Sequence, residues 1–230
     1  MKFGSREAVR AGWEAFKKNW KFFLLTGAVV LIFSTILNAV AQGLPDTLWP
    51  ISLLVGLSSW FIGIVMSIGI LKINIKAVYD EPLVLMDLYS HYQLFLKFLL
   101  AQFVANLASI VPVIVLAVGV MVFSTANGNV VLTVLGAFLT LVGLGLLIIV
   151  TTRLMFVQYF VVDREMGPAD AVRASWNATR GEVVNLILFG VLLFLVVILG
   201  LLALVVGLVV AIPVTTLATA YVYKKLSSEK

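Results

Sequence analysis

Three uncharged polar side chains recur at helical spacing near the middle of the chain: Gln102, Asn106 and Ser109. Steps of four and three residues put them on one face of an α-helix. A second stripe of the same kind comes earlier in the sequence: Ser34, Asn38 and Gln42. Inside apolar helices such groups either bond to a neighbouring helix, at about 0.6–2 kcal/mol per contact, or line a path for a solute. We favour interhelical bonding, and the candidates for a solute path are Asn38, Gln102 and Asn106.

Arg153 follows a long apolar run, and an arginine at the middle of a membrane costs about 2.5–3.5 kcal/mol. Its distance from a turn at residues 124–129 indicates a position nearer the membrane surface, where this free-energy cost is lower. Lys97 precedes this turn by nearly as many residues as Arg153 follows it, so both lie about 40 Å from the turn along helices that rise ~1.5 Å per residue. We therefore predict that Arg153 extends to the headgroup region. A buried functional charge is the alternative.

Side chains that carry acid–base, nucleophilic or metal chemistry are few. The chain has no Cys and one His. Since His91 has no Cys or second His as a co-ligand, a surface or packing role is favoured. The long apolar runs contain no Asp, Glu or His for paired chemistry, and the glycines are scattered rather than grouped in a phosphate-binding loop. We therefore expect no catalytic, cofactor-binding or metal-binding residues, and a protein that is not an enzyme.

The elements that position these residues are set by composition. The sequence is 62% hydrophobic and 12% charged, with a mean hydropathy of +1.14, whereas soluble proteins are roughly 25% charged. About 20 apolar residues cross the ~30 Å hydrocarbon layer as a helix. Residues 183–223 carry no charge and are long enough for two spans folded back near Gly200. The sequence therefore predicts an all-α integral membrane protein with six spans: residues 22–41, 51–71, 94–123, 130–162 and two within 183–223.

Charge placement predicts the orientation of these spans. All 16 Lys and Arg residues lie outside the turns at 42–50, at 124–129 and near Gly200. Because basic residues are retained on the cytoplasmic side of short loops, we predict that both termini are cytoplasmic. The net charge of +5 then points to anionic lipid headgroups, which attract juxtamembrane Lys and Arg by about 1 kcal/mol each. Nucleic acid is not needed as a partner.

A hexapeptide occurs twice, as AVRAGW at residues 8–13 and AVRASW at residues 171–176. Each copy belongs to an amphipathic segment that precedes a span. In the first, Val9, Trp13, Phe16 and Trp20 form the apolar face, with basic residues opposite. Tryptophan suits the membrane surface, where its ring is apolar and its N–H finds a polar partner. We therefore predict two interfacial helices, with Trp13, Trp20 and Trp176 as anchors.

A third, weaker copy is arguable at residues 85–95. An acidic residue precedes a basic one by ten positions in all three segments: Glu7 and Lys17, Asp87 and Lys97, and Asp170 and Arg180. The alternative is that this pattern is common in helices generally, because it suits the helix dipole. We predict a single membrane domain, residues 1–230, with a pseudo-threefold repeat. Each unit has an interfacial helix followed by a hairpin of two spans: residues 1–80, 81–163 and 164–230.

Three segments carry a resemblance to a known family. They are FVVDREMGPADAVRASWNATRGEV before the fifth span, GWEAFKKNW near the N-terminus, and Pro213 before ATAYVYKKL. This pattern resembles the membrane region of bacterial glycerophosphodiester phosphodiesterases and its stand-alone multi-pass relatives. The resemblance implies a helical bundle in the cytoplasmic membrane of a prokaryote. It does not imply catalysis, because the soluble barrel that carries the chemistry in the fused proteins has no counterpart here.

The sequence therefore favours a non-enzymatic, multi-pass membrane protein that assists or organises membrane partners or lipids. Its expected partners are the bilayer with its anionic headgroups and another membrane protein. The alternative is a carrier or exporter of a small amphiphile or lipid, which would need a polar cavity among the spans.

Overall fold

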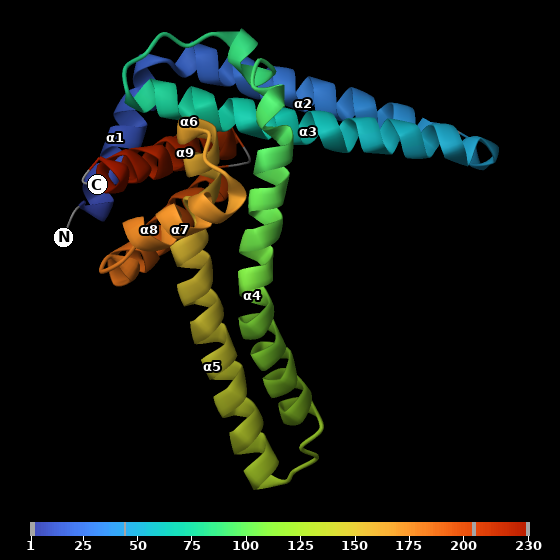
Figure 1. The fold of residues 1–230 in the computed structure, drawn as a ribbon, viewed down its shortest axis with the longest axis vertical. Helices are drawn as coiled ribbons and strands as arrows, with labels where there is room; N and C mark the ends of the chain where they lie inside the picture. Colours follow the sequence, from blue (N-terminus) through green and yellow to red (C-terminus); the bar gives the residue numbers. More distant parts are fainter. Residues whose placement is uncertain (1–2, 44, 204–205, 229–230) are drawn as a thin grey trace. The chain divides into compact units, whose positions relative to one another are not determined.

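The computed structural model describes residues 3–43, 45–203 and 206–228, and Figure 1 shows its helices. No strand occurs among these residues, and six of their helices are long and apolar enough to span a membrane. The protein is thus an all-α, multi-pass membrane protein, as predicted. Its contacts divide it into two compact units: unit 1, residues 1–99 and 189–230, and unit 2, residues 100–188. The single domain with three repeats stays a prediction.

Unit 1 contains the antiparallel hairpin of α2 and α3, which lie side by side in Figure 1. Its core lies at the Val78 end of α3, where buried apolar side chains from five elements meet: Phe16, Phe23, Ile73, Ala77, Leu88, Val214 and Leu217. The elements of unit 1 are α1 (Ser5–Lys18), α2 (Trp20–Gly43), η1 (Asp46–Leu48), α3 (Trp49–Val78), η2 (Leu85–Leu88), η3 (Tyr92–Leu94), the start of α4 (Phe95–Ser124), α8 (Val183–Leu202) from Phe189, and α9 (Val206–Ser227).

Helix α1 docks on α9 through small residues. Ala8 and Gly12 are buried, and a Cβ at Gly12 would lie 2.5 Å from the carbonyl oxygen of Val214 in α9. Only a glycine permits this close backbone approach. Polar contacts add to it, since the hydroxyl of Tyr221 donates to Glu7. This hydrogen bond is the main reason why the pKa of Glu7 lies below its usual value.

The first interfacial helix differs in part from its prediction. Helix α1 ends at Lys18, and Trp20 is instead the first residue of α2. The buried face comprises Ala8, Gly12 and Phe16, whereas Trp13 is exposed. The predicted apolar face therefore combined two surfaces, one that packs on protein and one that faces outward. Hydrophobicity alone does not separate these surfaces in a membrane protein, because lipid is also apolar.

The predicted middle interfacial helix at residues 85–95 is wrong. This segment forms two separate 3₁₀ turns, η2 and η3. Leu88 and Leu94 are both buried, but a spacing of six residues would put them on different sides of an α-helix. Tertiary contacts fix the segment instead: the backbone of Leu88 lies against Gly69 of α3.

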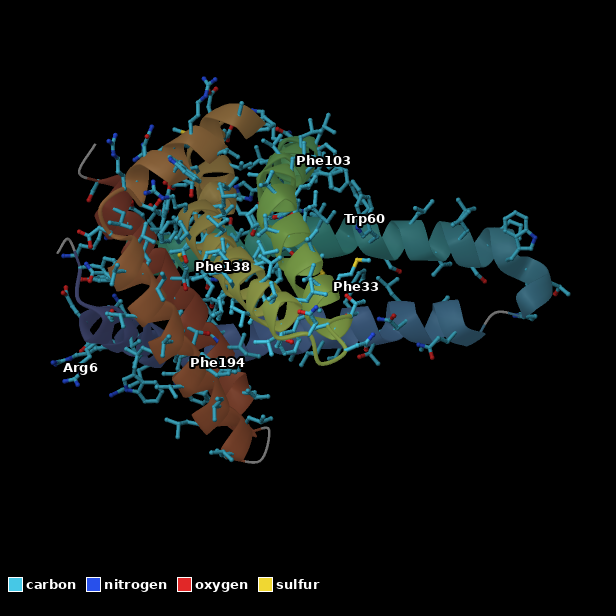
Figure 2. All side chains as sticks on the ribbon, turned by 90° about the horizontal axis from the view of Figure 1, so that it is seen from below. Arg6, Phe33, Trp60, Phe103, Phe138 and Phe194 are labelled. Carbon is cyan, nitrogen blue, oxygen red and sulfur yellow. The ribbon has the colours of Figure 1, made fainter. Side chains whose placement is uncertain are left out.

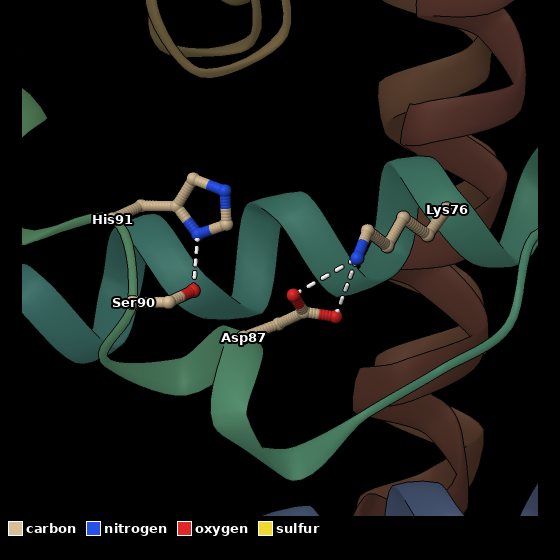
Figure 3. Close-up of polar contacts among 4 residues, drawn as sticks. All are labelled: Lys76, Asp87, Ser90 and His91. Carbon is tan, nitrogen blue, oxygen red and sulfur yellow. Dashed lines mark hydrogen bonds and ion pairs between the residues drawn. The ribbon is translucent and has the colours of Figure 1, made fainter.

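An ion pair also fastens this segment to α3. Lys76 Nζ lies 2.9 and 2.8 Å from the two carboxylate oxygens of Asp87, as Figure 3 shows. Both side chains are largely buried, with 21% and 10% of their surfaces exposed, so each charge needs the other. The same view shows His91 paired with its neighbour Ser90, with 2.9 Å between Nδ1 and Oγ.

Unit 2 contains a second hairpin, formed by α4 and α5. Gly119, Gly136 and Gly143 allow its close approach, since an added Cβ at each would collide with the facing backbone. At the turn, Asn127 and Gly128 adopt positive φ angles, and the side chain of Asn129 caps α5 by accepting from two backbone N–H groups. The remaining elements of unit 2 are α5 (Val130–Leu154), α6 (Val157–Arg164), α7 (Pro168–Ala178) and the start of α8.

The last two predicted spans and the long fourth span have clear counterparts. The apolar stretch at 183–223 is split into α8 and α9, which approach closely at Gly200 and Gly207. The predicted span at 130–162 is interrupted after Leu154, so that α6 is a separate and mostly buried helix. The expectation that residues beyond Arg153 leave the hydrocarbon layer stays a prediction.

The exposed surface of the spans is strongly apolar. Figure 2 labels five of the exposed aromatic side chains: Phe33, Trp60, Phe103, Phe138 and Phe194. Water-soluble monomers rarely expose apolar patches of this extent. A lipid environment is what this surface requires.

We expect Gly12→Ala to lower the free energy of unfolding by about 1–3 kcal/mol, because the new methyl group overpacks the contact between α1 and α9. Thermal unfolding of the purified protein in detergent measures this change. Gly27→Ala is the matched control, since nothing lies within 4 Å of a Cβ at Gly27 of α2. Equal unfolding temperatures for Gly12→Ala and Gly27→Ala would contradict the docking of α1 on α9.

Candidate functional site

The predicted polar stripe on α4 lines a hollow in unit 2. Its volume is about 230 Å³, and it is bounded by α4, α5 and α6. Gln102, Asn106 and Ser109 come from α4, as their spacing predicts. The other residues that line the hollow are Ala105, Thr151, Leu154, Met155, Val157 and Gln158.

Three amides in this hollow form a hydrogen-bonded chain, here called the amide ladder: Gln158, Gln102 and Asn106. Gln158 of α6 donates to the side-chain carbonyl of Gln102. Gln102 in turn donates to Asn106 Oδ1 at 3.2 Å. The first bond joins two helices and the second runs along α4. The predicted interhelical bonding is therefore present at Gln102.

The two hydroxyl groups beside the ladder are used within their own helices. Thr151 Oγ1 donates to the carbonyl of Leu147 at 2.7 Å, and Ser109 Oγ donates to the carbonyl of Ala105 at 3.4 Å. Their oxygens remain able to accept hydrogen bonds. None of the described residues that line this hollow is charged. The hollow can therefore bind polar groups, but it offers no acid, base or nucleophile activated by a base.

Asn38 belongs to a different hollow, which lies in unit 1 between α2 and α3 and has a volume of about 140 Å³. Asn38 Nδ2 donates to the backbone carbonyl of Ser34 at 2.8 Å. Three serines share this hollow with Asn38: Ser34, Ser59 and Ser67. All three donate to carbonyls of their own helices. Among the described residues of this hollow, no hydrogen-bonded polar chain joins two helices as it does in unit 2.

Arg153 lies in the last turn of α5 and contacts the second hexapeptide in α7. Its guanidinium carbon is 4.6 Å from the centre of the Trp176 ring, a cation–π contact. Ser175, the residue before Trp176, donates a hydrogen bond to the backbone carbonyl of Arg153 at 2.7 Å. Both contacts fasten α7 to the end of a span. A cation also suits this position, because the C-terminal end of a helix carries partial negative charge.

Trp13 and Trp20 are also paired with cations. Lys17 Nζ lies 6.0 Å from the Trp13 ring and Lys21 Nζ lies 5.7 Å from the Trp20 ring. All three predicted anchors are partly exposed, at 44%, 48% and 40% for Trp13, Trp20 and Trp176. Each presents a flat apolar ring with a positive charge beside it.

The two hexapeptides have the same pattern of burial. Ala8 and Ala171 are fully buried, whereas Trp13 and Trp176 are exposed to similar extents. The fifth position meets a backbone carbonyl of another helix in both copies. Gly12 lies against the carbonyl of Val214, and Ser175 donates to that of Arg153. The repeated hexapeptide is therefore a docking element that buries small residues and leaves its tryptophan outside.

Several residues of these sites are not evident from the sequence. Gln158 lies beyond the break between α5 and α6, so helical spacing from Thr151 does not place it. The role of Ser175 is not evident from the sequence, because serine is also common at protein surfaces. The serines of α3 had a detectable signal, since Ser52, Ser59 and Ser67 follow one helical face. Among the described residues, no group of three His, Asp or Glu side chains could hold a metal ion.

We expect Gln102→Leu and Gln158→Leu to show a coupling free energy of about 0.6–2 kcal/mol in a double-mutant cycle, since they remove the two ends of one interhelical bond. Unfolding of the purified protein in mixed micelles measures each variant. Asn38→Leu paired with Gln158→Leu is the control, and these two changes should be additive. A coupling of zero between Gln102 and Gln158 would show that the ladder does not exist in the folded protein.

Similarity to known proteins adds nothing to this geometry. No protein-family model, no curated protein and no solved structure matches the chain. The amide ladder and the tryptophan–cation pairs are the features of the molecule that point to a function.

Proposed function

We propose that this chain is a non-enzymatic, multi-pass membrane protein that assists or organises lipids and membrane partners at one membrane surface. The observation that carries the proposal is the repeated tryptophan–cation pair. A ring that reaches the headgroup region next to a Lys or Arg suits a surface of anionic lipid. The proposed location is the cytoplasmic membrane of a prokaryote, with both termini in the cytoplasm.

Two features support a binding role over a chemical one. The polar groups of the unit 2 hollow are amides and hydroxyls, which bind but do not transfer protons readily at neutral pH. The docking helices α1 and α7 each hold a tryptophan at the surface by packing small residues behind it. Membership of the family that the sequence resembles stays part of the proposal.

A carrier of a small amphiphile or lipid is the second candidate, and the unit 2 hollow favours it. Proteoliposomes test it directly with a fluorescent lipid whose outer-leaflet population is quenched by dithionite. A carrier would speed up exchange between leaflets relative to protein-free liposomes, and Asn106→Leu would slow it. Equal exchange rates with and without the protein would exclude this candidate.

For the main proposal, we expect Trp13→Ala and Trp176→Ala to loosen α1 and α7 from the membrane surface. Trypsin added to inverted membrane vesicles should then cleave these helices faster by about threefold or more, which corresponds to ~0.7 kcal/mol of lost docking. The sites include Arg10 and Lys17 in α1, and Arg173 and Arg180 in and after α7. Peptides identified by mass spectrometry give the rates.

Trp49→Ala is the matched control, because Trp49 is exposed at the start of α3 and far along the chain from both docking helices. Its cleavage pattern should equal that of the unaltered protein. Unchanged cleavage rates in Trp13→Ala and Trp176→Ala would contradict the proposed surface role of these residues.

A further inference from the structure

The amide ladder has two unused ends. In the structure, the NH₂ group of Asn106 has no acceptor and the side-chain carbonyl of Gln158 has no donor among the described residues. If all three amides were flipped, the ends would exchange roles, with a carbonyl free at Asn106 and an NH₂ group free at Gln158. Either way, the ladder offers one free donor group and one free acceptor group to the hollow.

The position of Asn106 makes its free polar end costly. Asn106 follows Lys97 by nine residues on α4, which is about 14 Å along the helix axis. If Lys97 marks the headgroup level, Asn106 lies well inside the hydrocarbon layer. An unbonded amide there loses several kcal/mol relative to water, roughly as measured for transfer into apolar solvents. An occupant that both accepts and donates hydrogen bonds would remove this cost.

The lining limits the chemical class of such an occupant. A phosphate needs a cation or several N–H donors, but the described lining residues include no Lys or Arg. An ammonium group offers donors alone and would be left without a counter-charge. A hydroxyl group both donates and accepts, and Ser109 and Thr151 provide further acceptor oxygens. The residues between the polar ones, such as Leu154 and Val157, suit an apolar chain.

We propose that the hollow of unit 2 binds an amphiphile with an uncharged, hydroxyl-bearing head, of the class to which mono- and diacylglycerols belong. The hydroxyl group bridges the free ends of the amide ladder, and the acyl chains follow the apolar surface of α4 and α5. This inference rests on the lipid-binding part of the proposed function and names the lipid class.

Photo-crosslinking in nanodiscs tests this site with the full-length protein. Three probes carry the same diazirine-bearing acyl chain and differ only in the head: a diacylglycerol, a phosphatidic acid and a phosphatidylcholine. We expect the diacylglycerol probe to label residues 102–109 and 151–158 at least fivefold more than the other two. Unlabelled monooleoylglycerol should compete with this labelling in the unaltered protein, so the result does not depend on any variant.

Variants then locate the interaction. Asn106→Leu and Gln158→Leu should lower the diacylglycerol labelling at least fivefold, while Asn38→Leu, in the hollow of unit 1, should leave it unchanged. Equal labelling by the three probes, stronger labelling by phosphatidic acid, or labelling that survives Asn106→Leu would each overturn the inference. The trypsin rates of the Trp13 and Trp176 variants are independent of this result, so failure of the lipid class and failure of the surface role are distinguishable.

Discussion

The hydrocarbon core of a bilayer offers no water to hydrogen-bonding groups, and this constraint governs where the chain can carry polar side chains. Short side chains meet it locally: hydroxyl groups along the spans donate to carbonyls one turn back in their own helices, as in Ser59, Ser67, Thr140 and Thr151. Gln102 and Gln158 are longer and instead bond to each other between helices. At the amide ladder, hydrogen bonds within one helix no longer satisfy the polar side chains. A ligand can provide a further hydrogen-bond partner there.

A second property of the lipid environment explains the docking helices. Two apolar helices in lipid gain little from hydrophobicity alone, so close packing of small residues becomes the main attraction between them. Ala8 and Gly12 provide it in unit 1. In unit 2, Ala171 and Ser175 do the same, and Ser175 adds a hydrogen bond. The tryptophan that follows is left at the surface, where it pairs with a cation.

The six spans and the two hexapeptide helices could be predicted from the sequence, because length and apolar composition determine them directly. The direction in which α1 faces could not, since hydropathy places Trp13 on the same side as Phe16 although one is exposed and the other buried. The prediction of a helix at residues 85–95 is wrong for a different reason. Its acidic and basic residues suit a helix. Asp87, however, forms an ion pair with Lys76, and this contact determines the conformation of the segment.

The site shows a similar division. The stripe of Gln102, Asn106 and Ser109 follows from helical spacing, and all three residues line the hollow. The partner of Gln102 does not follow from spacing, because a helix break separates Gln158 from α5. Arg153 was placed near the end of its span by counting residues from the turn, but its stacking on Trp176 is a tertiary contact that no local pattern reveals.

We propose that this chain crosses the membrane six times with both ends on one side. The sequence contains no Cys, so single-cysteine variants can be labelled with a membrane-impermeant maleimide on intact cells without background. Thr125→Cys, in the turn between α4 and α5, should be labelled, whereas Gly4→Cys and Ser228→Cys should react only after the membrane is permeabilised. Labelling of either terminal cysteine on intact cells, or protection of the cysteine at position 125, would contradict the account.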